Sequence, residues 1–336
     1  MHRTTNTLSA LSLVTAFSCG AQAQGMAPTV NGADAGDPIR LTAYEDNYAV
    51  WNQMRNNGWT TKDEQALRAR ISFKYSFCGQ QFRRSDPKKA QSTTENQNPV
   101  DTSCPNSGIW ADAELYFGYS AEFDFYAGTR PSGPVIGRVN APGFFARFPA
   151  NKLLGPDWGE TDGLEIGLQH RSDGQTTEVT SERDARIAGE RYAGGDRRFF
   201  DTISRGANFL LIAADKELPR PAIGESLVLR AKLRFYLGRQ DSDVTWGPLA
   251  NTGRRFSDYD RLQLQGWWRL GKDYLVDFAW RVGDRGFATD SWTLGFEFRG
   301  FGVPWYLRLH QGPMNTLSNY TQRQDSIGLG IRFAGF

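Results

Sequence analysis

A histidine and a serine stand two residues apart near the end of an alternating segment of this chain, at His170 and Ser172. The face of an extended strand that holds both otherwise carries apolar side chains, at Leu164, Ile166 and Leu168. Neighbours on one strand face are close enough for an imidazole to take the proton of a serine hydroxyl, the first step of nucleophilic acyl transfer. The pattern alone has two interpretations: a catalytic pair, or two polar residues at the rim where a strand meets water.

A catalytic histidine also needs a neighbour that holds its ring in one tautomer. We expect Asp201 to lie beside His170, provided that Phe209 and Leu211 share its face of the next strand. Arg205 breaks that alternation, so a bulge or a register change is an alternative. An ordinary carboxylate at a loop edge is the other interpretation of Asp201.

His310 is the other histidine that the expected mature chain contains. It shares its parity with Arg308 and Tyr306, which predicts an inward side chain with a hydrogen bond in the interior. We assign it no catalytic role.

The elements that must position these residues are extended segments with period-two alternation. The clearest is 227–237, where leucines, an alanine and a phenylalanine on one face oppose Arg230, Lys232 and Arg234 on the other. About twelve such segments occur, starting near Leu41, Ala66, Trp110, Gly143, Gly163, Phe199, Ser226, Arg261, Asp273, Ser291, Pro304 and Ser326. The pattern predicts an all-β fold, a twelve-stranded antiparallel transmembrane β-barrel over residues 41–336.

The composition fits a membrane-embedded barrel. The chain has 10 Trp, 12 Tyr and 22 Phe, which can form aromatic girdles, and its net charge is only +2 with no basic block, so nothing indicates nucleic acid. The predicted inner face mixes Arg and Lys with Glu and Asp. Because wide aqueous channels need about 16 strands or more, this predicts a filled lumen.

The first forty residues have a different character. A short apolar run from Leu8 to Phe17 precedes Ala21-Gln22-Ala23, which predicts a signal peptide over 1–23. Residues 24–40 are rich in Gly, Ala, Pro and Asp and are expected to be a flexible periplasmic segment. Together with the barrel, this predicts export to the bacterial outer membrane.

Two cysteines follow the expected cleavage site, Cys78 and Cys104, and they bracket a polar stretch. In an oxidising envelope such a pair most simply predicts one disulfide. Metal binding by two isolated cysteines is the weaker alternative.

Several pieces of the sequence, in order, resemble bacterial outer-membrane phospholipase A. They are Tyr44-Glu45-Asp46-Asn47-Tyr48, Ser132-Gly133-Pro134 through Pro142, His170-Arg171-Ser172-Asp173-Gly174, and Gln311-Gly312 through Gly330. The resemblance runs from Tyr44 to the C-terminus. It implies a twelve-stranded barrel that hydrolyses acyl esters of phospholipids, with A1, A2 and lysophospholipase activity.

The resemblance also implies roles for individual residues. Ser172 corresponds to the family's nucleophile and His170 to its base, while Asp201 stands for an asparagine that orients the imidazole. The backbone N–H of Asp173 corresponds to the protein part of the oxyanion hole.

A calcium ion and a second subunit are implied in the same way. The family binds Ca²⁺ at a homodimer interface, and its ligands correspond to Ser132 and to the carbonyl of Gln175. The remaining ligand has no clear counterpart and is sought in the charged loop 176–197.

Two rivals remain. A porin-like or structural barrel with a decayed site is favoured by the departures at Asp173, Gln175 and Asp201. A lipid A deacylase can also carry an outward His-x-Ser, but on about eight strands, fewer than this chain predicts.

Overall fold

The computed structural model describes residues 41–57, 63–78, 110, 112–127, 136–159, 161–173, 181–193, 202–219, 224–238, 255–317 and 320–334. The expected signal peptide and periplasmic segment, residues 1–40, lie outside these ranges, and so does Cys104. Cys78 ends a strand, and the predicted Cys78–Cys104 disulfide therefore stays a prediction.

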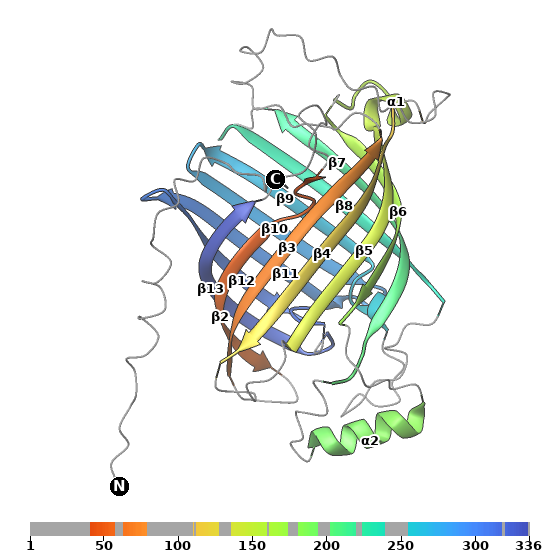
Figure 1. The fold of residues 1–336 in the computed structure, drawn as a ribbon, viewed down its shortest axis with the longest axis vertical. Coiled ribbons are helices and arrows are strands. Elements are labelled where there is room, and N and C mark those ends of the chain that lie inside the picture. The colour runs from red at the N-terminus through yellow and green to blue at the C-terminus, as the bar shows by residue number, and fades with distance from the viewer. Residues whose placement is uncertain are drawn as a thin grey trace, which may run out of the picture. The chain divides into compact units, whose positions relative to one another are not determined.

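The chain forms a closed antiparallel sheet (Figure 1). Its strands are β1 (Leu41–Thr42), β2 (Asn47–Asn57), β3 (Glu64–Cys78), β4 (Glu114–Tyr126), β5 (Ile136–Pro149), β6 (Gly163–Ser172), β7 (Gly206–Pro219), β8 (Ser226–Leu237), β9 (Leu262–Gly271), β10 (Tyr274–Gly283), β11 (Gly286–Gly300), β12 (Val303–Gly312) and β13 (Arg323–Ala334). In the described part of the chain, three helical elements accompany them: α1 (Ala150–Leu154), α2 (Glu182–Ala193) and the 3₁₀ turn η5 (Phe256–Asp258).

From β2 onward each strand pairs with its neighbour in the chain, and β13 pairs with β2 to close the ring. β1 adds no position of its own, because it pairs with the same edge of β3 as β2 does. The predicted twelve-stranded barrel is therefore confirmed. The predicted starts differ most at β5, which begins at Ile136 instead of near Gly143, and at β7, which begins at Gly206 instead of near Phe199. Smaller differences occur at β2 (Asn47 instead of near Leu41), β4 (Glu114 instead of near Trp110) and β11 (Gly286 instead of near Ser291).

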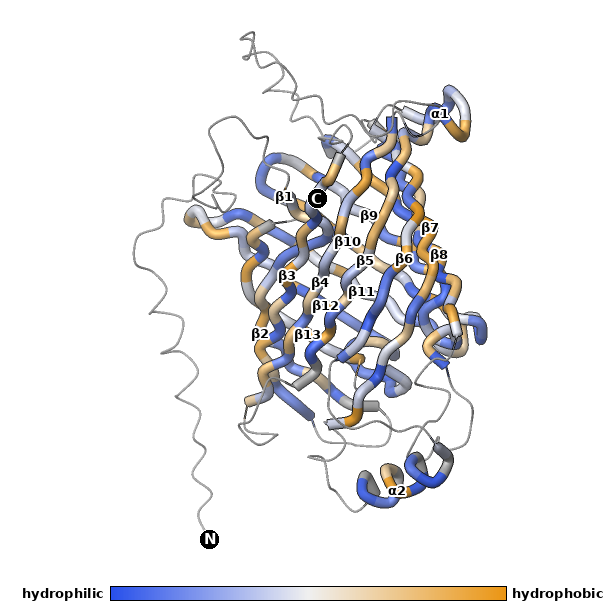
Figure 2. The backbone as a smooth tube through the Cα atoms, turned by 45° about the vertical axis from the view of Figure 1, so that its right-hand side comes forward, coloured by the Kyte–Doolittle hydropathy of each residue, from blue (hydrophilic) through white to orange (hydrophobic). Residues whose placement is uncertain are grey.

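Hydropathy alternates along the strands, as Figure 2 shows. In β8 the side chains of Arg230, Lys232 and Arg234 are buried inside the ring, while Leu229 and Phe235 are exposed on the outer wall. This partition suits a wall that faces hydrocarbon outside and polar groups inside.

The outer wall is a belt of large apolar side chains. It includes Trp51, Leu67, Ile71, Phe125, Phe144, Leu168, Leu229, Phe235, Leu264, Phe278, Trp292, Leu294, Ile327, Leu329, Ile331 and Phe333, all exposed. A water-soluble surface does not expose so much apolar area, so this belt indicates an outer-membrane type of barrel. Within the described ranges, no helix is long and apolar enough to cross a bilayer.

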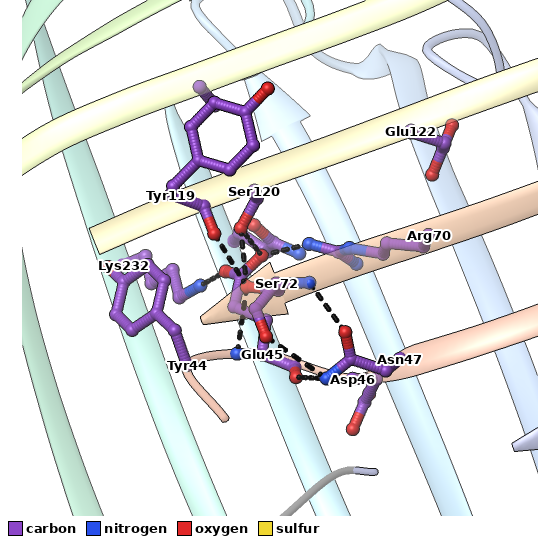
Figure 3. A network of polar contacts seen from close by, with 12 residues as sticks. Tyr44, Glu45, Asp46, Asn47, Arg70, Ser72, Tyr119, Ser120, Glu122 and Lys232 are labelled. Carbon is purple, nitrogen blue, oxygen red and sulfur yellow. Dashed lines mark hydrogen bonds and ion pairs between the residues drawn. The ribbon is translucent and has the colours of Figure 1, made fainter. Parts of the chain in front are cut away.

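Residues 43–46, between β1 and β2, bend into the lumen. Thr42 pairs with Lys74 and Tyr48 with Arg70, so the five residues 43–47 stand opposite only three residues of β3. The extra length turns Glu45 inward, where its carboxylate forms ion pairs with Arg70 and Lys232 (Figure 3).

Further buried ion pairs fill the lumen along its length. Arg230 Nη2 lies 2.7 Å from Glu165 Oε1, Arg68 Nε lies 2.7 Å from Asp124 Oδ1, and Asp46 pairs with Arg332. A cavity of about 120 Å³ remains, lined by charged side chains that include Glu45, Arg70 and Lys232. The filled lumen is as the sequence predicts, because paired charges are the form in which ionic groups are tolerated inside proteins.

His310 faces inward, as predicted. Its side chain is buried, Thr293 Oγ1 lies 2.9 Å from Nδ1, and the carbonyl oxygen of Gly312 lies 3.2 Å from Nε2. Both ring nitrogens therefore have interior partners.

Replacing Glu45 tests whether the inward bend holds the barrel together. In Glu45→Gln, the half-buried Arg70 and the buried Lys232 lose their shared anion, so we expect the free energy of unfolding to fall by about 3 kcal/mol. Urea unfolding of the barrel from lipid vesicles measures it. Asp273→Asn is the matched control, since its ion pair with Lys272 lies on the surface and should contribute less than about 0.5 kcal/mol. A Glu45→Gln barrel as stable as the wild type would show that the bend is not a structural anchor.

Candidate active site

β6 carries His170 and Ser172 on the outer wall of the barrel. Between them Arg171 turns inward, where its Nη1 lies 2.9 Å from Oδ2 of the buried Asp260. Because side chains alternate along a strand, His170 and Ser172 face outward with Leu168, which is 58% exposed. The predicted outward placement of the pair is confirmed, while its catalytic role stays a prediction.

The strand register brings an asparagine of β7 to the histidine. His170 pairs with Asn208 and Ser172 with Gly206. The N–H of Asp173 donates to the carbonyl of Arg205 at 3.0 Å, so both pairs occupy the narrow positions of the ladder, where opposed Cα atoms are about 4.5 Å apart.

At that short separation, Nδ1 of His170 lies 2.8 Å from Oδ1 of Asn208. An amide oxygen only accepts hydrogen bonds, so Nδ1 must carry the proton. Nε2 is then the basic nitrogen of the neutral ring. This is the tautomer that a general base needs.

Asp201, the predicted third residue, lies outside the described residues. The parity assumed for its strand is wrong. Phe209 and Leu211 are 2% and 1% exposed and face the lumen, where they pack with Tyr44, Tyr116 and Phe145. Asn208 therefore faces outward, and the sequence analysis missed it because it took the aromatic and aliphatic residues of β7 to be lipid-facing.

A signal in the sequence could have located Asn208. Asp215 is buried inside, where it accepts hydrogen bonds from Arg147, and counting back from it in steps of two reaches Phe209, Ala207 and Arg205. A charged residue marks the inner face of such a strand more reliably than an apolar one, since apolar side chains pack on both faces. Arg205, which seemed to break the alternation, obeys it.

Asp173 takes part in a buried ion pair at the end of β6. Its carboxylate accepts hydrogen bonds from the backbone N–H of Arg205 at 2.8 Å and from Nη1 at 3.4 Å, and both side chains are fully buried. Its own N–H is used by the carbonyl of Arg205. The expectation that this N–H supplies the oxyanion hole therefore does not hold in this structure.

The two ring nitrogens of His170 differ in their surroundings. Nδ1 is held by Asn208, whereas among the described residues no hydrogen bond joins Nε2 to the Ser172 hydroxyl. Catalytic hydrogen bonds are often long without substrate and shorten when it binds.

The predicted calcium ligands Ser132 and Gln175 both lie outside the described ranges. Within those ranges no three His, Cys, Asp or Glu side chains are grouped as metal ligands, and Asp173 is committed to Arg205. Among the described residues, therefore, no cluster of carboxylates marks a calcium site, and no chemical step is derived through the metal.

No protein-family model matches this chain, and no curated protein matches it. Solved structures do. Outer membrane phospholipase A from Escherichia coli is similar with a TM-score of 0.56 at 15% identity, over 88% of this chain and 99% of that one. An active-site mutant of it, with alanine in place of an asparagine, has a TM-score of 0.55 at 15% identity, over 89% and 93%.

The calcium-bound dimer of the Salmonella typhi outer membrane phospholipase has a TM-score of 0.55 at 14% identity, over 89% of this chain and 94% of that one. At such low identity the likeness shows the fold alone. The barrel of this chain is of the outer membrane phospholipase A type.

The His170–Asn208 contact can be tested without any assay of activity. In the wild type we expect the neutral His170 ring to carry its proton on Nδ1, and in Asn208→Leu the other tautomer to gain population, because the acceptor is gone. Ring-nitrogen NMR shifts of labelled protein distinguish the tautomers, with His170→Gln used to assign the signal. The His310 signal is the internal control. Identical His170 shifts in wild type and Asn208→Leu would refute the contact.

Proposed function

We propose that this chain is an outer-membrane hydrolase that cleaves acyl esters of phospholipids, with Ser172 as nucleophile and His170 as base. Asn208 orients the imidazole. The observation that carries the proposal is the 2.8 Å contact between Nδ1 of His170 and Oδ1 of Asn208 on the outer wall, beside Ser172. The active-site asparagine of the similar Escherichia coli enzyme supports the same role for Asn208.

The proposed reaction has two halves. Nε2 of His170 takes the proton of Ser172 as Oγ adds to the ester carbonyl carbon, and the resulting tetrahedral intermediate carries the negative charge on its oxygen. His170 then returns the proton to the leaving alcohol oxygen, which leaves an acyl-Ser172 ester and a lysophospholipid. Water, deprotonated by His170, attacks that ester, and His170 then returns the proton to Oγ of Ser172 as the acyl–oxygen bond breaks and the fatty acid is released.

The position of the site favours a lipid as substrate. Polar side chains on a lipid-facing wall are costly unless they serve a function. Leu168 and Ile166 precede His170 on the same outer face of β6. Phe144 of β5 is the cross-strand partner of Leu168, and 63% of its surface is exposed. These side chains can contact the acyl chains of a phospholipid whose ester lies level with Ser172.

Asn208 suits this site better than the predicted aspartate. A carboxylate at a lipid-facing position would have to be paired or neutralised, whereas a neutral amide accepts the Nδ1 hydrogen bond with less desolvation. The proposal therefore replaces the expected Ser-His-Asp triad with Ser-His-Asn.

Calcium dependence and dimerisation belong to the same proposal. They are supported by the calcium-bound dimer of the similar Salmonella typhi phospholipase and by an outward site that a second barrel could reach. Export by the signal peptide 1–23 and residence in the bacterial outer membrane complete it.

Mutation can determine which residue orients the imidazole of His170. We expect Ser172→Ala to reduce phospholipid hydrolysis to background and Asn208→Leu to lower kcat by up to about 100-fold, because a base held in the wrong tautomer loses much of its contribution. Asp201→Ala should stay near the wild-type rate. Release of fatty acid from phospholipid in mixed micelles measures all three.

The control is Ser326→Ala, which removes a hydroxyl that faces the lumen. Full activity of Ser172→Ala would end the proposal. If Asp201→Ala lost phospholipid hydrolysis and Asn208→Leu did not, the orienting role would belong to Asp201.

Chelation tests the metal separately. Removing calcium should lower turnover, and adding it back should restore both turnover and chemically cross-linked dimer. Calcium binding to inactive Ser172→Ala, measured by equilibrium dialysis, gives a second readout. Turnover that is unchanged in excess chelator would remove calcium from the proposal.

A further inference from the structure

The tetrahedral intermediate on Ser172 needs a hydrogen-bond donor for its oxyanion. The N–H of Asp173 is engaged by the carbonyl of Arg205, and the atom of Asn208 that contacts His170 is Oδ1, an acceptor. Among the described residues, a donor is therefore sought elsewhere around Ser172. The strand on the other side of β6 offers one.

Asn140 of β5 is the direct cross-strand partner of Ser172. Its neighbours in the chain, Val139 and Ala141, are buried on the inner face, so Asn140 faces outward with Ser172. Directly opposed residues of an antiparallel pair have their Cβ atoms about 4.5–5.5 Å apart. The carboxamide of Asn140 is thus within reach of an oxygen bonded to the carbon that Ser172 attacks.

Tyr119 fixes the orientation of that carboxamide. Its phenol donates a hydrogen bond to Oδ1 of Asn140 at 2.7 Å, from β4 on the far side of β5. The Tyr119 ring packs against Phe73, with the ring centroids 5.4 Å apart. Because Oδ1 of Asn140 is held toward β4, the amide nitrogen Nδ2 of the same planar carboxamide points away from Tyr119. No described residue accepts a hydrogen bond from Nδ2.

We propose that Asn140 is a catalytic residue whose Nδ2 donates a hydrogen bond to the oxyanion, and that Tyr119 is the residue that positions it. The inference rests on the proposed function, since it assigns a donor to an intermediate that forms only if Ser172 attacks an ester. A preorganised donor strengthens as charge develops on the oxygen. It therefore acts on kcat more than on KM.

The test compares kcat and KM for phospholipid hydrolysis by full-length variants. Asn140→Leu has nearly the same shape and no donor, and we expect kcat to fall by about 10²–10³-fold with little change in KM. Asn140→Asp keeps an acceptor for the Tyr119 phenol but lacks the N–H groups, and it should lose a similar factor. It also serves as the second variant should Asn140→Leu not fold, and the electrophoretic shift of folded barrels on heating checks folding.

Tyr119→Phe tests the positioning role. It should lower kcat in the wild-type background and have no further effect in the Asn140→Leu background, because a residue that acts through Asn140 has nothing left to position. Tyr274→Phe, at an exposed tyrosine on the outer wall of β10, is the matched control and should retain wild-type kcat.

The outcomes separate the inference from its premise. If Ser172→Ala is inactive while Asn140→Leu and Asn140→Asp keep wild-type kcat, the role of Asn140 is overturned and the proposed function stands. A rise in KM alone would make Asn140 a ground-state contact and overturn the inference as well. Additive losses in the Tyr119→Phe, Asn140→Leu double variant would overturn the positioning role. A wild type with no hydrolysis at all would overturn both the function and the inference.

Discussion

In a closed antiparallel ladder, consecutive side chains point to opposite sides of the wall, and none can change side without a bulge. Closure leaves no free edge, so every strand is fixed by two neighbours. At the end of β6 this constraint turns His170 and Ser172 outward and Arg171 inward, to Asp260. The same register sets Asn208 beside the imidazole and Asn140 beside the hydroxyl, so the site consists of side chains from three adjacent strands.

The interior supplies the rigidity that such a site needs. Ion pairs between strands that are not paired with each other, such as Arg230 of β8 with Glu165 of β6, and the inward bend at Glu45 cross-link parts of the sheet that are distant in sequence. Near the site, the Arg171–Asp260 and Arg205–Asp173 pairs anchor β6 and the start of β7 from inside. Because these charges are buried, a shift of either strand would leave an ionic group without its partner. The outer face can therefore hold polar groups at fixed spacing without support from solvent.

The chemistry of the outer wall follows from its surroundings. A site that faces hydrocarbon favours neutral groups, and the side chains gathered around Ser172 are an imidazole, two carboxamides and a phenol, with the formal charges of Arg171, Asp173 and Arg205 on the inner side. Asn208 holds one nitrogen of the imidazole and leaves the other for the proposed role of base. In the proposed reaction, charge would develop only in the intermediate, where oriented amide dipoles interact with it most strongly.

The sequence by itself determined the barrel, the number of its strands and the outward His170–Ser172 pair, because period-two alternation is local and strong in segments such as 227–237. It failed at β7, where Phe209 and Leu211 suit either side of the wall and where Asp201 was chosen instead of Asn208. Which asparagine contacts which side chain depends on how strands far apart in the sequence pair, and the long connection between Ser172 and Gly206 leaves that register open to sequence reasoning. Only the tertiary structure, through the ladder between β6 and β7 and the burial of Arg205 with Asp173, decided it.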